Sequence, residues 1–186
     1  PMTCNMKKLM LPDFFQASEV PIVHKFYRNY FKDCYVCGDV DYIFGPNTAF
    51  FDHCEIHSIA RVSEGKAYIT AASTPAGQEF GLVFSHCRIT GEEPDSVYLG
   101  RPWRDCAKTA FICCELGDHI CPEGWQNWGK VRAEVLSDYI EYGNFGPGAD
   151  CSGRSPLSRC LVNPEVETYF SKENVLVGED GWIPAE

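Results

Sequence analysis

The chain has 186 residues, of which 45% are hydrophobic and 23% charged, and its formal net charge is −10. This composition fits one folded domain and excludes a chain that is disordered throughout, and no apolar run approaches the roughly 20 residues of a membrane-spanning helix. The acidic balance argues against a nucleic-acid partner, because phosphate backbones bind basic surfaces, but only weakly against an anionic substrate held by a local arginine.

The first 30 residues show no clear hydrophobic period. Pro1–Cys4 lacks the charged-then-apolar run of a signal peptide, so no such peptide is predicted within this sequence. We treat residues 1–30 as a divergent N-terminal segment of a single domain that covers residues 1–186.

A short pattern recurs four times from residue 31 onward: an aromatic residue, two further residues, a cysteine, one residue and an aliphatic residue. Its cysteines are Cys34, Cys54, Cys87 and Cys114, at separations of 20, 33 and 27 residues. Short β-prone runs with a recurring small residue favour a parallel β-helix, in which like residues stack about 4.8 Å apart from coil to coil. From the repeat alone, an antiparallel sandwich with cysteines in its core is the alternative.

The segment Gly38–Gly45 places two carboxylates in a strand rich in aromatic residues. Strand alternation puts Val40, Tyr42 and Phe44 on one face and Asp39 and Asp41 on the other. This pattern fits either a functional pair of acids or a solvated face whose charges protect a sheet edge.

In the segment Tyr98–Trp103, Arg101 lies between a glycine and a proline, so a turn fixes its backbone. A guanidinium can hold a carboxylate in a two-bonded fork, and the nearby indole of Trp103 offers a flat surface to a sugar ring. The alternative is a structural turn with a half-buried tryptophan.

Two tryptophans follow, Trp125 and Trp128, and their spacing predicts that they face different ways and that at least one lies in the core. Farther along, Asn163 and Pro164 predict the start of a helix that runs to Phe170. With the apolar run 175–177 and the turn at 180–182, residues 151–186 are expected to form a C-terminal cap after coils in residues 31–150.

The cysteines and histidines do not match a zinc motif. In a strand, Cys34 and Cys37 point to opposite faces, and no second pair at a suitable spacing completes a four-ligand site. No histidine has a serine or cysteine partner at a recognisable spacing. The sequence thus predicts neither a metal site nor a cofactor.

Several of these motifs, in this order, resemble those of pectin methylesterases. The matching segments are Gly38–Gly45, Tyr68–Ala72 with Gln78 and Gly81, Leu99–Trp103, Pro122–Trp128, Glu141–Ala149 and Asp180–Trp182. The resemblance implies a right-handed parallel β-helix, secretion, and hydrolysis of the methyl esters of galacturonate residues in pectin, with pectin as the partner.

The resemblance also implies roles for individual residues. Asp41 stands at the position of the nucleophilic carboxylate, Arg101 at that of the arginine that orients it, and Trp103 and Trp125 at aromatic positions of the sugar cleft. Asp39 matches no catalytic position.

The chain departs from the family in its first 30 residues, where the first coils and the Gln-Asp-Thr motif of the general acid are not found. The acids nearby, Asp13 and Glu19, lie in unrelated surroundings, so neither is assigned that role. Two hypotheses follow: an esterase with an incomplete β-helix, or an inactive, pectin-binding or structural β-helix.

Overall fold

The structure is a computed structural model that describes residues 5–6, 9–10, 27–178, 180–182 and 184. Most of the divergent segment 1–30, including Asp13 and Glu19, lies outside the described residues. Within the described ranges, no helix is both long and apolar enough to cross a lipid bilayer.

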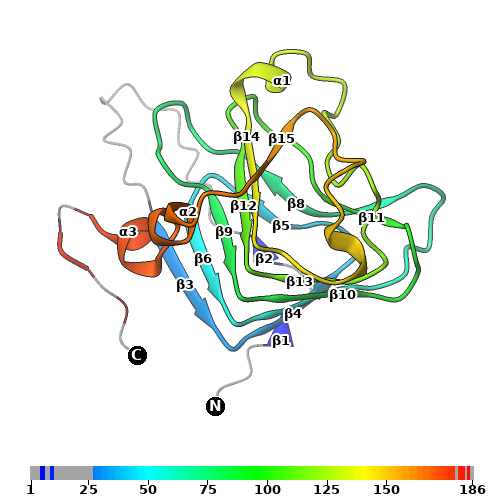
Figure 1. Cartoon of the computed structure of the whole chain (residues 1–186), viewed down its shortest axis with the longest axis horizontal. Coiled ribbons are helices and arrows are strands. Elements are labelled where there is room, and N and C mark those ends of the chain that lie inside the picture. The colour runs from blue at the N-terminus through cyan, green and yellow to red at the C-terminus, as the bar shows by residue number, and fades with distance from the viewer. Residues whose placement is uncertain (1–4, 7–8, 11–26, 179, 183, 185–186) are drawn as a thin grey trace.

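The described strands form three parallel sheets (Figure 1). Sheet A contains β1 (Asn5–Met6), β4 (Tyr35–Gly38), β7 (Glu55–Ser58), β10 (Arg88–Gly91) and β13 (Glu115–Leu116). Sheet B contains β2 (Leu9–Met10), β5 (Val40–Gly45), β8 (Ala67–Ala72) and β11 (Val97–Gly100). Sheet C contains β3 (Arg28–Lys32), β6 (Thr48–Asp52), β9 (Leu82–Ser85), β12 (Lys108–Ile112), β14 (Asp138–Tyr142) and β15 (Ser158–Leu161).

The chain visits sheets A, B and C in turn and then begins again one level higher. For example, β4, β5 and β6 form one coil, and β7, β8 and β9 form the next. Every strand pair is parallel. The predicted parallel β-helix is therefore confirmed, and the antiparallel sandwich is ruled out.

The sequence repeat forms two ladders inside this β-helix. Four phenylalanine rings stack in register, with centroid distances of 4.8, 4.6 and 4.5 Å: Phe31, Phe51, Phe84 and Phe111. The four cysteines of the repeat follow at the corner between sheets C and A, and all are buried. A cysteine is small enough for this corner and tolerates an apolar environment, which explains its recurrence without a metal.

The residue before each ladder cysteine has a left-handed backbone conformation. The four residues, with φ between 51° and 54°, are Asp33, His53, His86 and Cys113. This conformation turns the chain from sheet C into sheet A. Because the turn repeats from coil to coil, these four side chains leave the β-helix at equivalent positions.

The C-terminal tail packs against the outer face of sheet C. It contains α2 (Glu165–Tyr169) and α3 (Lys172–Leu176), in agreement with the predicted helix near Asn163. Val175 and Leu176 are buried against apolar side chains of sheet C such as Phe50 and Val83. The tail thus covers apolar surface, but on the side of the β-helix rather than over its last coil.

The last coil is closed by aromatic and polar groups from the loops around it. Trp125 stacks on Tyr139 of β14 at 4.2 Å, and its indole N–H donates to Glu141 Oε1 at 2.9 Å. Loop residues between β14 and β15 include the 3₁₀ helix Pro147–Ala149 and Arg154, which forms an ion pair with Glu141. A disulfide joins Cys151 to Cys160 in the same region. The short helix α1 (Ala133–Leu136) precedes β14.

Candidate active site

Asp41 and Arg101 meet on the outer face of sheet B. Asp41 lies in β5 and Arg101 directly after β11, and β8 is the strand between them. Arg101 Nε donates to Asp41 Oδ1 at 2.9 Å and Nη2 donates to Oδ2 at 2.6 Å. The two side chains are 16% and 20% exposed, so the fork is partly desolvated yet open to solvent on one side.

A β-bulge directs Asp41 outward. The pairing of β5 with β8 shifts between Val40 and Ile43, and Asp41 has a φ of 49°. A bulge of this kind re-aims side chains and is frequent beside active sites. It also breaks the predicted alternation: Tyr42 is buried, whereas Phe44 lies on the outer wall beside Trp103.

The approach of Arg101 to Asp41 depends on the glycine before it. A β-carbon on Gly100 would lie 2.0 Å from Thr70 Oγ1, so only glycine lets β11 pack this closely on β8. The Arg101 amide then donates to Thr70 O at 3.0 Å. This local geometry fixes the start of the arginine side chain.

The guanidinium of Arg101 lies between two aromatic rings. Its central carbon is 3.9 Å from the centroid of the Tyr68 ring and 3.7 Å from that of the Trp128 ring. Both contacts are close enough for strong cation–π attraction. Tyr68 and Trp128 therefore hold the plane of the guanidinium in the orientation in which it meets Asp41.

A hollow of about 300 Å³ opens beside Trp103. Its lining includes Arg104 and Lys130, and Lys130 Nζ donates to the carbonyl oxygens of Pro102 and Trp103, both at 2.7 Å. Burial, together with the positive charge of Arg104, lowers the pKa of Lys130. The wall around Trp103 thus carries two cationic side chains although the whole chain is acidic.

The structure separates the two tryptophans of the segment 122–129, as their spacing predicts. Trp125 is 2% exposed and lies in the core, so its ring does not reach the outer wall where Asp41 and Arg101 lie. The expectation of Trp125 as a cleft residue does not fit this position. Trp128, 38% exposed, is the tryptophan that contacts Arg101, and sequence reasoning gave it no role.

Among the described residues, no second carboxyl group forms a hydrogen bond with the carboxylate of Asp41. Both side-chain hydrogen bonds to this carboxylate come from Arg101. The carboxylate of Asp39 accepts from the amide of Val40 instead. Gln78, another residue of a matching motif, is buried, and its amide group donates to the backbone oxygens of Pro46 and Phe80. Gln78 therefore supports the loops around β6 and β9 rather than the site.

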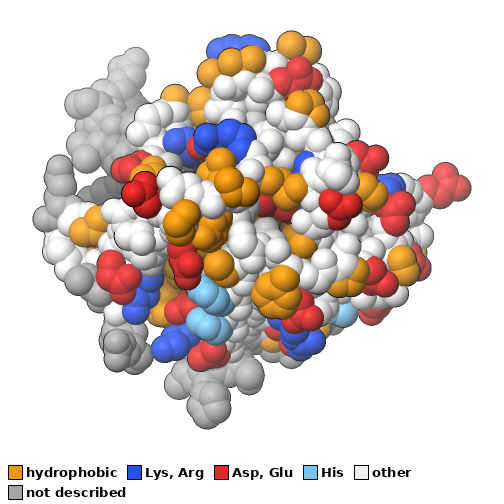
Figure 2. Space-filling model, in the orientation of Figure 1, with side chains coloured by type: hydrophobic (Ala, Val, Ile, Leu, Met, Phe, Trp, Pro, Cys, Tyr) orange, Lys and Arg blue, Asp and Glu red, His pale blue; other side chains and the backbone are white. Residues whose placement is uncertain are grey.

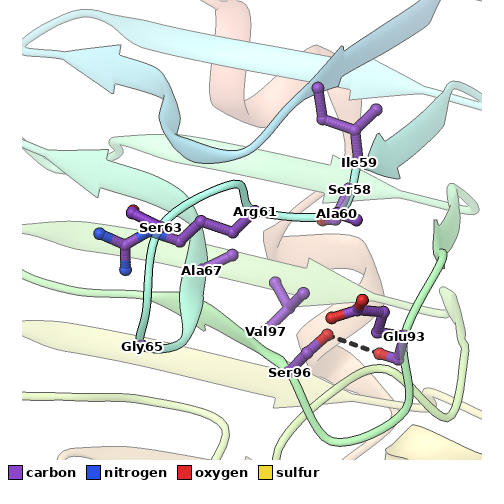
Figure 3. A pocket seen from close by; sticks show the side chains of 10 residues that line it. All are labelled: Ser58, Ile59, Ala60, Arg61, Ser63, Gly65, Ala67, Glu93, Ser96 and Val97. Atoms are coloured by element: carbon purple, nitrogen blue, oxygen red, sulfur yellow. Dashed lines mark hydrogen bonds between the residues drawn. The ribbon is translucent and has the colours of Figure 1, made fainter.

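A second hollow, of about 240 Å³, shares no lining residue with the hollow beside Trp103. Figure 3 shows the side chains that line it. The hollow is formed by the loop after β7, including Arg61 and Ser63, and by Glu93 and Ser96 before β11. Arg61 is already bonded to Ser63 and to the backbone of Lys66, and Ser96 to the backbone of Glu93. This hollow contains no arrangement comparable to the Asp41–Arg101 fork.

Comparison with known proteins identifies relatives over most of the chain. The pectinesterase family model matches residues 16–179. Pectinesterase 31 of Arabidopsis thaliana is 40% identical over 140 residues, which are 74% of this chain and 43% of that protein. Pectinesterase 2 of Olea europaea is 36% identical over 145 residues, which are 77% of this chain and 38% of that protein.

Solved structures agree with the sequence comparison. A pectin methylesterase from carrot superposes with a TM-score of 0.74 at 30% identity, covering 83% of this chain and 51% of that one. A pectin methylesterase in complex with a hexasaccharide has a TM-score of 0.68 at 28% identity, covering 84% of this chain and 53% of that one. The chain spans about half the length of these relatives or less. With its parallel β-helix and the motifs along sheet B, this chain belongs to the pectinesterase family.

Proposed function

We propose that this chain is a carbohydrate esterase that hydrolyses the methyl esters of polygalacturonate, with Asp41 as its nucleophile. The main support is the fork between Asp41 and Arg101 on the outer wall, where a polymer can reach it. An arginine fork keeps a carboxylate ionised and in one orientation, and both properties favour nucleophilic attack.

In the proposed reaction, an oxygen of Asp41 attacks the carbonyl carbon of the ester. The bond from that carbon to the methoxy oxygen breaks, and a general acid supplies the proton with which methanol leaves. Water then attacks the resulting anhydride, which releases the galacturonate carboxylate and restores Asp41. Arg101 remains paired with Asp41 and balances the negative charge that develops beside it.

The surroundings of the fork suit a sugar acid polymer. Trp103 follows Arg101 by two residues and packs edge-on against Phe44, with the ring centroids 5.6 Å apart, so that it offers an aromatic surface to a sugar ring. Arg104 and Lys130 add positive charge near Trp103, where the free carboxylates of partly esterified pectin can bind. The related enzyme solved with a hexasaccharide supports the same class of ligand.

We also propose an extracellular location. The disulfide between Cys151 and Cys160 fits an oxidising compartment.

A second candidate function is binding of pectin without hydrolysis. It is favoured by one observation: among the described residues, the Asp41 carboxylate has no second carboxyl group as a hydrogen-bond partner. Loss of a general acid lowers an esterase rate by roughly 10²–10⁴. Asp13 and Glu19, the acids before residue 27 considered above, lie outside the described residues.

The two functions differ in methanol release from highly esterified pectin. For the esterase, Asp41→Asn should lower release at least about 10³-fold, because an amide is a poor nucleophile. Asp39→Asn is the matched control, two residues away and directly before β5, and should keep the wild-type rate. Equal release by wild type and Asp41→Asn would remove Asp41 from the mechanism. Pectin binding that is lost in Trp103→Ala, without any release by wild type, would establish the second function.

A further inference from the structure

Three side chains of different chemistry converge on the surface between sheet C and the C-terminal tail. They are His86 in the turn after β9, Cys113 in the turn after β12 and Glu167 in α2. One ligand atom from each lies within 4.8 Å of the other two, and His86 Nε2 is 3.8 Å from Glu167 Oε1. This separation is too long for a hydrogen bond but close to that of two ligands on one metal ion.

The fold itself aligns the histidine and the cysteine. Both occupy the left-handed corner position described above, with φ values of 54° and 53°. Their amides are fixed by the next coil: His86 N donates to Ile112 O at 2.9 Å, and Cys113 N donates to Tyr142 O at 2.8 Å. The two side chains therefore project in parallel from adjacent coils.

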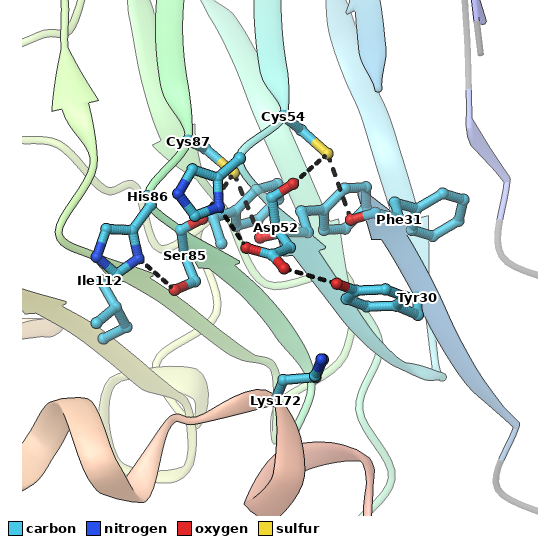
Figure 4. A network of polar contacts seen from close by, with 12 residues as sticks. Tyr30, Phe31, Asp52, Cys54, Ser85, His86, Cys87, Ile112 and Lys172 are labelled. Atoms are coloured by element: carbon cyan, nitrogen blue, oxygen red, sulfur yellow. Dashed lines mark hydrogen bonds and ion pairs between the residues drawn. The ribbon is translucent and has the colours of Figure 1, made fainter. Parts of the chain in front are cut away.

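A neighbouring hydroxyl orients the imidazole of His86 (Figure 4). Ser85 Oγ lies 3.0 Å from His86 Nδ1, so Nε2 is the ring nitrogen that faces Glu167. The ring also stacks on that of His53 at 5.2 Å, and His53 Nδ1 is bonded to Asp52 at 2.6 Å. Figure 2 shows two histidine side chains next to each other on this face, beside acidic ones. Partners on the second ring nitrogen are typical of metal-binding histidines.

The absence of a side chain at Gly143, in the last coil, leaves room for the thiol of Cys113. The thiol lies over Gly143, where an added β-carbon would come within 3.0 Å of Sγ. Cys113 is half-buried, whereas His86 and Glu167 are exposed, so an ion from solvent can reach all three.

We propose that His86 Nε2, Cys113 Sγ and a carboxylate oxygen of Glu167 bind a Zn²⁺ ion, with water in the fourth position. A set of one nitrogen, one sulfur and one oxygen ligand suits zinc better than Ca²⁺ or Mg²⁺, which prefer oxygen. Binding releases the thiol proton to solvent, and the thiolate and carboxylate then balance the charge of the ion.

The geometry requires only small movements. Zinc bonds of roughly 2.0–2.3 Å place tetrahedral ligands roughly 3.3–3.8 Å apart. The present separations, none longer than 4.8 Å, must therefore shrink by about 1.5 Å at most. Rotation of the exposed Glu167 side chain can supply most of this shortening. The bound ion would connect α2 to the turns of two coils and so stabilise the packing of the tail on sheet C.

The other group with suitable atoms is Glu141 with Cys151 and Cys160. It is closed to a metal, because the two sulfur atoms form a disulfide. Among the described residues, the surface cluster is thus the better candidate.

The test uses the full chain in oxygen-free buffer, which preserves the Cys113 thiol without reducing the disulfide. Calorimetric titration with ZnCl₂ should give one site, and a hundredfold excess of Zn²⁺ over its Kd should raise Tm by roughly 5 °C or more. Titration with Co²⁺ should produce a thiolate-to-cobalt charge-transfer absorption, which only a sulfur ligand gives.

His86→Asn, Cys113→Ser and Glu167→Gln should each weaken Zn²⁺ binding roughly 100-fold, and Cys113→Ser should also remove the charge-transfer absorption. The controls His57→Asn and Cys106→Ser replace the same residue types elsewhere and should bind like wild type. Glu167→Gln changes only an exposed helix position, so it tests the site even if another variant does not fold. Wild-type affinity in all three ligand variants, or no charge-transfer absorption with Co²⁺, would overturn the proposal.

Discussion

Among the described residues, two arginines each hold a carboxylate through two nitrogen atoms, and these two forks differ in what surrounds them. Arg101 meets Asp41 at 2.9 and 2.6 Å, and Arg154 meets Glu141 at 2.9 and 3.0 Å. The first pair is 16% and 20% exposed on the outer wall. The second is 4% and 2% exposed within the last coil. Nearly identical bonding thus occurs at the surface and in the interior.

The partners of each fork indicate its role. Arg154 also donates to the backbone oxygens of Gly148 and Pro122, and Glu141 also accepts from the indole of Trp125. The polar groups of this fork are satisfied within the protein, as a buried ion pair requires. The Arg101 guanidinium lies between aromatic rings instead, and its carboxylate partner stays open to solvent. A carboxylate that solvent reaches can react with a substrate, whereas a fully buried fork can only stabilise the fold.

The largest expected difference between the forks is in stability. Glu141→Gln leaves the buried Arg154 charge without a counter-ion and should lower the free energy of unfolding by about 3–5 kcal/mol. Asp41→Asn should lower it by less than about 1 kcal/mol, because solvent reaches that pair. Urea unfolding of the two variants, followed by circular dichroism, measures both values. Similar losses would contradict the distinction between a structural fork and a reactive one.

A buried group without a partner extends the comparison. His119 is 1% exposed, and neither ring nitrogen has a hydrogen-bond partner among the described residues. Burial lowers the pKa of His119 from the usual 6.5 of a histidine to about 4. The imidazole of His119 therefore binds a proton less readily in the folded state than in the unfolded state.

The sign of the effect follows from that difference. The contribution of His119 to stability is complete above pH 6.5 and is lost as the pH falls through about 4. Between pH 7 and pH 4 the loss should be on the order of 3 kcal/mol. Urea unfolding at several pH values measures it, and His119→Gln should show a flatter profile. An unchanged profile in that variant would assign the pH dependence to other groups.

The smallest expected effect concerns the aromatic clamp on Arg101. Trp128→Leu should lower the rate of methanol release roughly 3–30-fold, which corresponds to the loss of one cation–π contact. KM should change less than kcat, because Trp128 acts as a positioning residue through Arg101. Trp128→Phe should restore most of the rate, since it keeps an aromatic face. A larger change in KM than in kcat would indicate that Trp128 contacts the substrate instead.

Much of the fold could be predicted from the sequence. The repeat of phenylalanine and cysteine predicted the ladders, because identical residues stack favourably at the same position of successive coils. The turn of Gly100–Pro102 correctly indicated a fixed arginine. The resemblance to pectin methylesterases then paired Arg101 with Asp41, which no spacing could do, since 60 residues and coils of unequal length separate them.

Other features depend on contacts that local patterns do not contain. Alternation placed Tyr42 and Phe44 on one face, but the bulge after Val40 put them on opposite sides. The choice between Trp125 and Trp128 depended on which ring could stack on Tyr139 inside the last coil.

The sequence by itself therefore determined the repeating unit and the residue types of the fork, and the resemblance to a known family favoured the parallel β-helix over the sandwich. Only the tertiary structure decided which side chains meet across coils. Examples are the two aromatic rings around Arg101, the buried partners of Glu141 and the surface cluster around Cys113. The physical reason is that the strands of each coil follow from the local alternation of inward and outward side chains. Which distant side chains meet depends instead on the lengths of the loops between the strands, and these lengths vary. Because the loop lengths vary, the sequence has no regular period from which these contacts between coils can be predicted.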